Sequence, residues 1–358
     1  MESIEHVFLE DIPEFSHKIG KVMAEAFHLV IGSGSIARRH IRNLQALFPE
    51  IPVACVSASG RPLEPEECGA DKVYPDLAAA VEAGPAMAIV ASPAPSHMLQ
   101  AGRLLDARVP ILIEKPLAHS LADIAPVWER LVASGVPVEV GYNLRYLPSA
   151  VVVKEWLDSG RLGRVYSVMA EVGQYLPDWR PQSDYRKNVS AQRRLGGGAL
   201  LELSHEFDYL TWLFGRFDRA YCVSAKASSL EIDVEDRVDV VLSRSEGLVA
   251  TVHLDFLQRV TTRTCKIIAE EATLLWNLAT NSVSLLAPGK EPEVVFNDPG
   301  YDRNIMYLDE LERFRKVAHR QAEPAVTVGE AAYIVSLVEA LKTSSQSQQA
   351  VLIKEFEL

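Results

Sequence analysis

The 358-residue chain lacks the features that mark disulfide-rich, membrane-spanning and nucleic-acid-binding proteins. It has only 4 cysteines and no C-x-x-C pair, which argues against a disulfide framework and predicts reduced thiols in a cytoplasmic protein. No apolar run reaches the length that crosses a bilayer, and the acidic residues 1–14, interrupted by Pro13, are unlike a signal peptide. Basic residues are too few to balance the acidic ones, which leaves a net charge of -12 and disfavours nucleic acid and anionic membranes as partners.

A glycine-containing turn is the first informative feature that is present. Residues 27–31 form an apolar run of strand length, and residues 36–48 carry apolar side chains at helical spacing. Between them, Gly32 permits a tight turn and Gly34 lets the backbone approach a pyrophosphate. The start of the helix, at Ser35 and Ile36, would offer free N–H groups to the phosphates. The pattern predicts a dinucleotide site, and a tight turn without a ligand is the alternative.

Strands and amphipathic helices then alternate up to about residue 145, which predicts a parallel sheet with helices on both faces. Ligands of such sheets bind beyond the carboxyl ends of the strands. Three successive predicted strands, at residues 86–91, 111–113 and 138–140, end in polar or turn-forming residues. These are Ser92, Pro93 and His97, then Glu114 and Lys115, and finally Tyr142, Asn143 and Arg145. We expect the first two groups to contact the cofactor and the third to bind substrate.

The chain resembles the glucose-fructose oxidoreductase and inositol dehydrogenase (Gfo/Idh/MocA) family of nicotinamide-dependent sugar oxidoreductases. The resemblance rests on five phrases in the family's order, GSGSIARRH, VASPAPSH, EKPLAHS, GYNLRYLP and GGGALLELSHEFDYLTWLFG. It implies a second domain with an open, mostly antiparallel sheet, of which one face carries substrate and the other makes oligomer contacts. We therefore predict an extension over residues 1–26, a Rossmann domain over 27–145 and an α+β substrate domain over 146–358. A homodimer or homotetramer through the second sheet follows from the same resemblance.

The second half of the sequence fits this expectation. One helix is predicted over residues 200–214, after three glycines, and further helices over 301–318 and 328–343. Short runs rich in β-branched residues predict strands over residues 220–228, 237–242, 248–256, 264–269 and 272–276.

Lys115 is the predicted catalytic residue. An amine beside a positively charged nicotinamide would be poorly solvated, so its pKa would fall and it could exchange a proton with a sugar hydroxyl. In the family the matching lysine also binds that hydroxyl. A lysine solvated in a loop is the alternative.

His205 is the second catalytic candidate, and Glu202 is the third. The resemblance implies an aspartate four residues before the histidine, but Leu201 stands there and the carboxylate is Glu202, three before. Three residues also return to the same helical face, so Glu202 could tune His205. Asp208 shares that face and is predicted to bind substrate. Structural roles for His205 and Glu202 are the alternatives.

A basic segment over residues 176–195 precedes this helix. It contains Arg180 and four further basic residues against two aspartates. In an acidic protein such a segment is suited to an anionic group, such as a sugar acid or a nucleotide sugar. A solvated or subunit-bridging loop is the alternative.

The end of the second predicted strand bears on cofactor choice. An NAD enzyme usually places Asp or Glu there, whereas this chain has Ser57, Ser59 and Arg61. Two hydroxyls and an arginine suit a 2′-phosphate, which favours NADP(H) and leaves NAD(H) open.

These observations predict an NAD(P)-dependent oxidoreductase that moves hydride between nicotinamide and a carbinol carbon of a sugar or sugar derivative. No metal is expected, since no cluster of histidines and carboxylates indicates one. A nicotinamide-dependent glycoside hydrolase of the same fold and a non-catalytic dinucleotide sensor are the alternatives.

Overall fold

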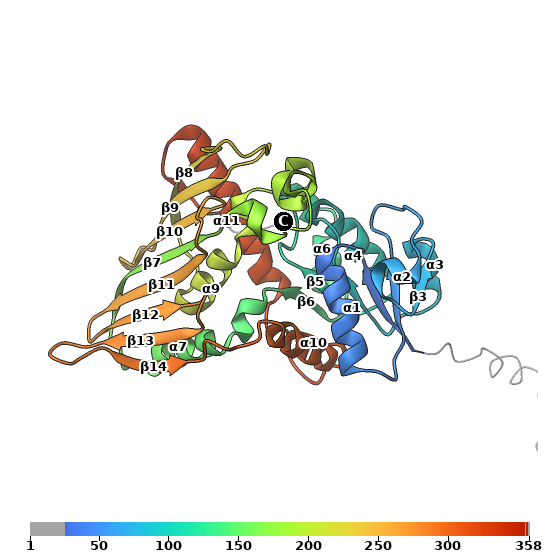
Figure 1. Cartoon of the computed structure of the whole chain (residues 1–358), viewed down its shortest axis with the longest axis horizontal. Helices are drawn as coiled ribbons and strands as arrows, with labels where there is room; N and C mark the ends of the chain where they lie inside the picture. Colours follow the sequence, from blue (N-terminus) through green and yellow to red (C-terminus); the bar gives the residue numbers. More distant parts are fainter. Residues whose placement is uncertain (1–25, 355, 357–358) are drawn as a thin grey trace, which may run out of the picture.

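The computed structural model describes residues 26–354 and 356, so the predicted extension over residues 1–26 lies almost entirely outside the described residues. Two sheets stand apart with helices between and around them (Figure 1). The fold class predicted from the sequence, a Rossmann-like domain followed by a mostly antiparallel α+β domain, is confirmed.

The first sheet is parallel, with strand order β3-β2-β1-β4-β5-β6. Its central strands are apolar and fully buried because helices cover both faces. The strands are β1 (His28–Ile31), β2 (Val53–Val56), β3 (Lys72–Tyr74), β4 (Met87–Val90), β5 (Ile111–Glu114) and β6 (Val138–Gly141). The helices are α1 (Ser35–Leu47), α2 (Pro65–Cys68), α3 (Leu77–Glu82), α4 (His97–Asp106), α5 (Leu121–Ile124) and α6 (Trp128–Ala133). The order changes direction between β1 and β4, where ligands of such sheets bind.

The second sheet has nine strands in the order β14-β13-β12-β11-β7-β10-β9-β8-β15. Neighbours are antiparallel except β7 and β10, which run parallel. The strands are β7 (Val165–Gly173), β8 (Arg219–Ala225), β9 (Arg237–Ser243), β10 (Val249–Asp255), β11 (Thr262–Ala269), β12 (Thr273–Asn277), β13 (Ser282–Leu286), β14 (Glu293–Asn297) and β15 (Val351–Leu352). The five predicted strands are present, while β7, β13, β14 and β15 were not predicted.

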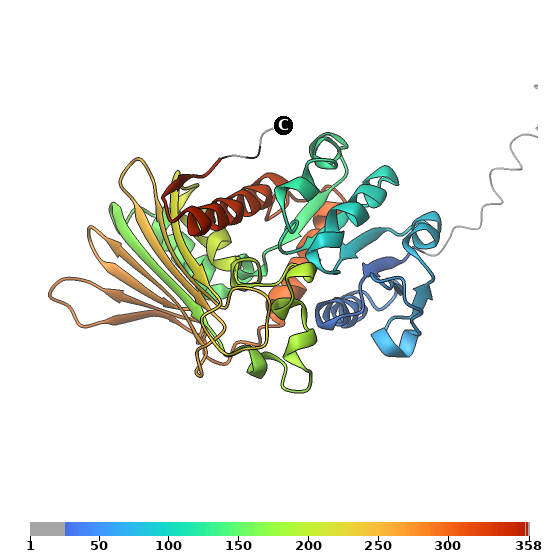
Figure 2. The same ribbon diagram turned by 90° about the horizontal axis from the view of Figure 1, so that it is seen from above.

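Helices lie on one face of this second sheet, and its other face is open (Figure 2). The covering helices include α7 (Pro148–Asp158), α9 (His205–Phe214) and α11 (Val328–Ser347). On the open face, paired positions of neighbouring strands place a row of exposed side chains across the sheet. In order across the sheet, the row is Tyr221, Val241, Thr251, Met169, Lys266 and Leu275, so that it is apolar at four of these positions and polar at two. The homo-oligomer through this face stays a prediction.

The helix α10 (Ile305–Ala318) connects the two halves. It follows the second sheet in sequence, yet Leu311, Phe314 and Val317 belong to the same buried cluster as Ile41 and Leu44 of α1. The division predicted at residue 146 therefore assigns α10 to one half of the chain although it packs against the other.

The single helix predicted over residues 200–214 is wrong. The segment forms α8 (Ala199–Glu202) and α9, with a break at Leu203 and Ser204. At the break, the Glu206 N–H bonds to the Leu203 carbonyl at 3.3 Å rather than to that of Glu202. The Glu202 carbonyl is thereby left open to another donor.

Candidate active site

The turn between β1 and α1 requires glycine at its first position. Gly32 has φ +127°, and a Cβ there would lie 2.5 Å from the Ala91 carbonyl oxygen at the end of β4. Side chains rarely adopt this φ, and backbone cannot yield to such a contact. Gly32 therefore serves the close approach of β1 and β4 and is needed whether or not a ligand binds.

Gly34 is different, because nothing in the protein itself requires glycine there. Its φ is -74°, and a Cβ would meet no atom within 4 Å. Among the residues that the structure describes, no side chain caps the start of α1 at this residue. The first N–H groups of α1, including those of Ser35 and Ile36, therefore have no partner within the helix, and Gly34 and Ser35 are exposed. This arrangement fits the pyrophosphate of a dinucleotide.

The end of β2 carries the predicted cofactor-selecting residues. The Ser57 and Ser59 hydroxyls lie 3.3 Å apart. The exposed Arg61 donates to Glu67 at 2.9 Å, and this contact, with smaller contributions from other groups including Arg38, lowers the pKa of Glu67. The Ser57 and Ser59 hydroxyls and the cations Arg61 and Arg38 therefore lie in this region, although the Arg61 guanidinium is already paired with the Glu67 carboxylate.

The residues after β4 connect the turn that follows β4 to the turn that follows β5. His97 is 1% exposed, and its ring nitrogens lie 2.8 Å from the Ser92 carbonyl and 3.0 Å from the Pro116 carbonyl. Ser92 donates its hydroxyl to Gln100 at 2.7 Å, and Pro93 begins the turn before α4. Because both nitrogens of His97 face backbone carbonyls, this residue holds the β4 turn against the turn that carries Lys115.

Lys115 extends from the end of β5 to the helix break in the second domain. Its Nζ donates to the open Glu202 carbonyl at 2.9 Å. The Glu202 carboxylate points elsewhere and accepts from Ser190 Oγ at 2.8 Å. Within residues 26–354, no bond joins that carboxylate to His205. The structure thus assigns Glu202 to the positioning of Lys115, through its backbone.

His205 lies beside Lys115 at the start of α9. Its Nδ1 is buried without a hydrogen-bond partner, and its ring stands edge-on to Tyr142 with centroids 5.5 Å apart. Burial, followed by the charges of Lys115, Arg263 and Arg303, holds the pKa of His205 well below its usual value. The imidazole is therefore neutral, and the same surroundings disfavour its protonation.

The predicted substrate-binding side chains are largely engaged by the protein itself. Arg145 makes two bonds to Asp208, at 2.7 and 3.1 Å, and a third to Glu330 at 2.9 Å. Tyr142 donates its hydroxyl to Ser204 at 3.3 Å and is fully buried. Asn143 is 5% exposed. Arg145 and Tyr142 thus hold the start of α9 against the first domain. The guanidinium of Arg145 also donates to the Ala325 carbonyl at 2.8 Å, so the protein itself takes up its donors.

A second buried ion pair beside His205 was not predicted. Arg263 of β11 contacts both carboxylate oxygens of Glu206, at 2.7 and 2.9 Å, and Glu206 is 0% exposed. The partners are 57 residues apart in the sequence, so no local pattern could have indicated the pair.

The basic segment lies against the dinucleotide domain. Its last turn, Arg193–Leu195, contacts the turn Ala94–Ser96 after β4, and a Cβ on Gly196 would lie 3.3 Å from Ala94. Arg180 is exposed. The segment therefore stands next to the site, as an anion-recognition role would require.

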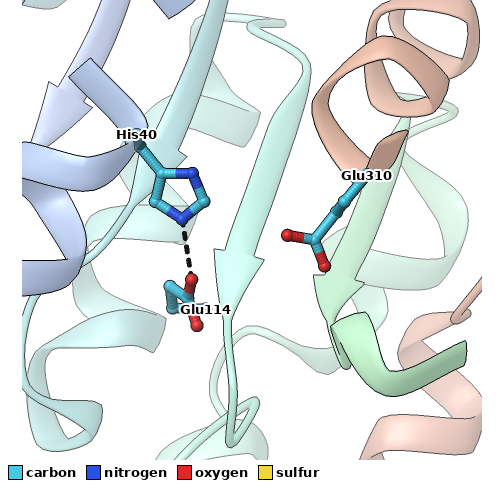
Figure 3. Close-up of side chains that lie close together, drawn as sticks. All are labelled: His40, Glu114 and Glu310. Carbon is cyan, nitrogen blue, oxygen red and sulfur yellow. Dashed lines mark hydrogen bonds and ion pairs between the residues drawn. The ribbon is translucent and has the colours of Figure 1, made fainter. Parts of the chain in front are cut away.

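Glu114 lies in a buried cluster behind Lys115 (Figure 3). Its Oε1 is 2.7 Å from Nε2 of His40 on α1, and its Oε2 accepts the Lys115 N–H at 3.2 Å. Glu310 of α10 points toward this pair, and neither of its oxygens has a hydrogen-bond partner. One ligand atom from each of the three lies within 4.8 Å of the others, a spacing compatible with a metal ion. We interpret the cluster as a proton-holding one, because His40 and Glu114 already bond to each other.

Replacing Glu310 by glutamine is expected to stabilise the protein increasingly as pH rises. Burial, followed by the charges of Glu114 and Glu139, raises the pKa of Glu310 well above its usual value. In the unfolded chain the pKa of this carboxyl is about 4.3. Above that pH the folded state holds a proton that the unfolded state has lost, so stability falls by up to about 1.4 kcal/mol per pH unit until the folded pKa is reached. Glutamine removes this loss.

The measurement is the thermal midpoint of the parent and Glu310→Gln between about pH 5 and 8, a range that begins above the pKa of an unfolded glutamate. Glu312→Gln, on the exposed side of α10, is the matched control and should follow the parent. A difference that does not change with pH would contradict the proton-holding interpretation.

Comparison with known proteins identifies the family. A family model described as "Oxidoreductase family, NAD-binding Rossmann fold" matches residues 28–142, and one described as "GFO/IDH/MocA C-terminal domain" matches residues 151–275. The chain belongs to the GFO/IDH/MocA family. The resemblance inferred from its motifs is thereby confirmed.

Several curated relatives are named as inositol or levoglucosan dehydrogenases. The chain is 29% identical over 194 residues to inositol 2-dehydrogenase of Streptomyces avermitilis, covering 52% of each chain. It is 24% identical over 319 residues to levoglucosan dehydrogenase of Pseudarthrobacter phenanthrenivorans, covering 79% of this chain and 74% of the relative. The match to an uncharacterized oxidoreductase of Synechocystis spans only 38% of that relative, so the chain covers about half or less of some relatives.

Solved GFO/IDH/MocA structures share the whole fold. Levoglucosan dehydrogenase in complex with NADH superposes with a TM-score of 0.80 at 18% identity, over 92% of this chain and 100% of that one. The WlbA dehydrogenase of Bordetella pertussis, in complex with NADH and UDP-GlcNAcA, gives a TM-score of 0.77 at 19% identity, over 92% and 99%. Within the described part of this chain, no helix is both long and apolar enough to cross a membrane.

Proposed function

We propose that this protein is a nicotinamide-dependent oxidoreductase that moves hydride between the nicotinamide and a carbinol carbon of a sugar or sugar derivative. One observation carries the proposal. The Lys115 amine, held by the Glu202 carbonyl beside neutral His205, lies at the carboxyl edge of a sheet whose first helix begins at the open Gly34. The relatives named as inositol and levoglucosan dehydrogenases support the substrate class.

The residues of the chain would handle the proton of the reacting hydroxyl. A bound dinucleotide would accept or donate the hydride. Lys115 takes the hydroxyl proton when the alcohol is oxidised and returns it when the carbonyl is reduced. His205 presents a neutral ring that orients the hydroxyl, and the nearby positive charges stabilise negative charge that develops on the oxygen.

The cofactor we favour is NADP(H). The second strand ends without a carboxylate at Ser57, and Arg61 and Arg38 both lie near Glu67, which supports recognition of a 2′-phosphate. A bound 2′-phosphate would draw Arg61 away from Glu67. The neighbours solved with NADH leave NAD(H) as the alternative.

Calorimetric titration with NADP(H) and NAD(H) tests both statements. The parent should bind NADP(H) more tightly than NAD(H). Arg61→Ala should lower the affinity for NADP(H) by about tenfold, through the loss of one charge-assisted contact, and leave the affinity for NAD(H) unchanged. Arg42→Ala, on the exposed side of α1, is the control. A preference for NAD(H) would overturn only the cofactor choice. Binding of neither would refute the oxidoreductase proposal.

A further inference from the structure

Positive charge exceeds negative charge around His205. Lys115, Arg263 and Arg303 all lie near enough to its ring to disfavour a charged imidazole. Glu206 is the carboxylate that adjoins this group, and Arg263 occupies both of its oxygens. In a chain of net charge -12, a local excess of cations at the candidate active site is unlike the rest of the molecule.

Arg303 lies in the connection between β14 and α10, where both halves of the chain anchor it. Its Nη1 donates to the Leu278 carbonyl at 3.0 Å, and the Leu278 N–H bonds to the carbonyl of Arg263 at 2.9 Å. The next residue, Asn304, exchanges two side-chain bonds with Asn43 of α1. These contacts hold Arg303 beside the Arg263–Glu206 pair and next to the dinucleotide domain.

The guanidinium of Arg303 differs from those of Arg145 and Arg263 because it is not paired with a carboxylate among the described residues. Arg145 binds Asp208 and Glu330, and Arg263 binds Glu206. Among residues 26–354, no carboxylate forms an ion pair with Arg303, which is exposed. The adjacent Asp302 instead accepts the backbone N–H of Asn304.

We propose that Arg303 binds an anionic group of the substrate, a carboxylate or a phosphate. The inference rests on the proposed oxidoreductase function and narrows its substrate to a sugar that carries a negative charge. Although Arg303 is exposed at its surface, surrounding protein partly desolvates the guanidinium, and this effect, followed by the charge of Arg263, lowers its pKa. An anion there would relieve repulsion between two arginines as well as form charge-assisted hydrogen bonds.

The position of Arg303 also gives it a role distinct from that of Arg180. Arg180 belongs to the exposed basic segment that contacts the β4 turn, whereas Arg303 is linked through Leu278 to Arg263, the partner of Glu206 on α9. An anion held by Arg303 would therefore be oriented relative to His205, and this orientation decides which carbinol carbon reaches Lys115.

Three probes that differ in charge test the proposal, namely D-glucose, D-glucuronate and D-glucose 6-phosphate. Their affinities for the NADH- or NADPH-bound full chain are measured by calorimetry at low salt in the parent, Arg303→Gln, Arg303→Lys and Arg180→Gln. At least one anion should bind about tenfold or more tightly than glucose, and which one does identifies the carboxylate or the phosphate. Arg303→Gln should remove this preference, Arg303→Lys should keep part of it, and glucose affinity should stay unchanged.

The outcomes separate this proposal from the one on which it rests. Equal affinities for glucose and both anions, or an anion preference that survives in Arg303→Gln, would overturn the role of Arg303 while leaving the oxidoreductase proposal intact. A preference lost in Arg180→Gln alone would assign the anion to the basic segment instead. Failure to bind any nicotinamide dinucleotide would overturn the oxidoreductase proposal itself, and with it the substrate role of Arg303.

Discussion

Replacing Lys115 by methionine is expected to slow hydride transfer by about 100- to 10,000-fold, the usual contribution of a positioned acid or base, which is a far larger effect than the loss of its predicted contact with the dinucleotide. Methionine keeps most of the length of the side chain but cannot exchange a proton. Within the protein, the substitution removes one hydrogen bond to the Glu202 carbonyl, worth only about 1 kcal/mol. The fold should therefore survive the change.

Single-turnover kinetics, followed by nicotinamide absorbance, separate this effect from product release. Lys115→Arg is the matched variant, because it keeps the charge and can still bond to the carbonyl but does not release a proton near neutral pH. Both variants should be slow, and both should unfold near the parent's midpoint. A methionine variant with the parent's rate would move the acid–base role to His205.

Replacing each of the two glycines of the first turn by alanine is expected to affect a different property, namely stability at Gly32 and dinucleotide binding at Gly34. Gly32→Ala puts a Cβ 2.5 Å from the Ala91 carbonyl oxygen at φ +127°, so we expect a loss of about 3 kcal/mol or more of unfolding free energy. Gly34→Ala meets nothing within 4 Å, and alanine restricts the unfolded chain more than glycine does. The fold should tolerate it.

Dinucleotide binding is the property that Gly34→Ala should change. Its methyl group would stand where the pyrophosphate must approach the backbone, so affinity should fall by about tenfold or more in a protein that is as stable as the parent. Thermal unfolding and calorimetric titration of the same preparations measure both effects. If Gly34→Ala binds dinucleotide as the parent does, the open space beside α1 is not the pyrophosphate site.

Much of the first domain could be predicted because its determinants are local. Each apolar strand is followed by a turn and an amphipathic helix, and the parallel order follows from that alternation. The turn at Gly32 was predicted for the same reason. The strand β7 was missed although its alternation, with Val168, Ala170 and Val172 buried and Met169 exposed, is the period-2 pattern of a strand.

The site was less predictable because its contacts join residues far apart in the chain. The phrase around residues 196–215 indicated His205, but not that the helix breaks before it or that the Glu202 carboxylate turns to Ser190. The pair of Arg145 and Asp208 spans 63 residues. A sequence suggests that such side chains are polar and well placed, but only the packed structure determines whether they face a ligand or each other.

The return of α10 to the first domain has a consequence for how such proteins can be cut or recombined. A fragment that ends at residue 145 would leave Ile41 and Leu44 without Leu311 and Phe314, which share their buried cluster, and would expose apolar surface to water. Exchange of second domains between relatives would need to carry α10 and its partner surface on α1 as a matched set. The unit that can be exchanged between relatives is therefore the whole chain rather than either domain.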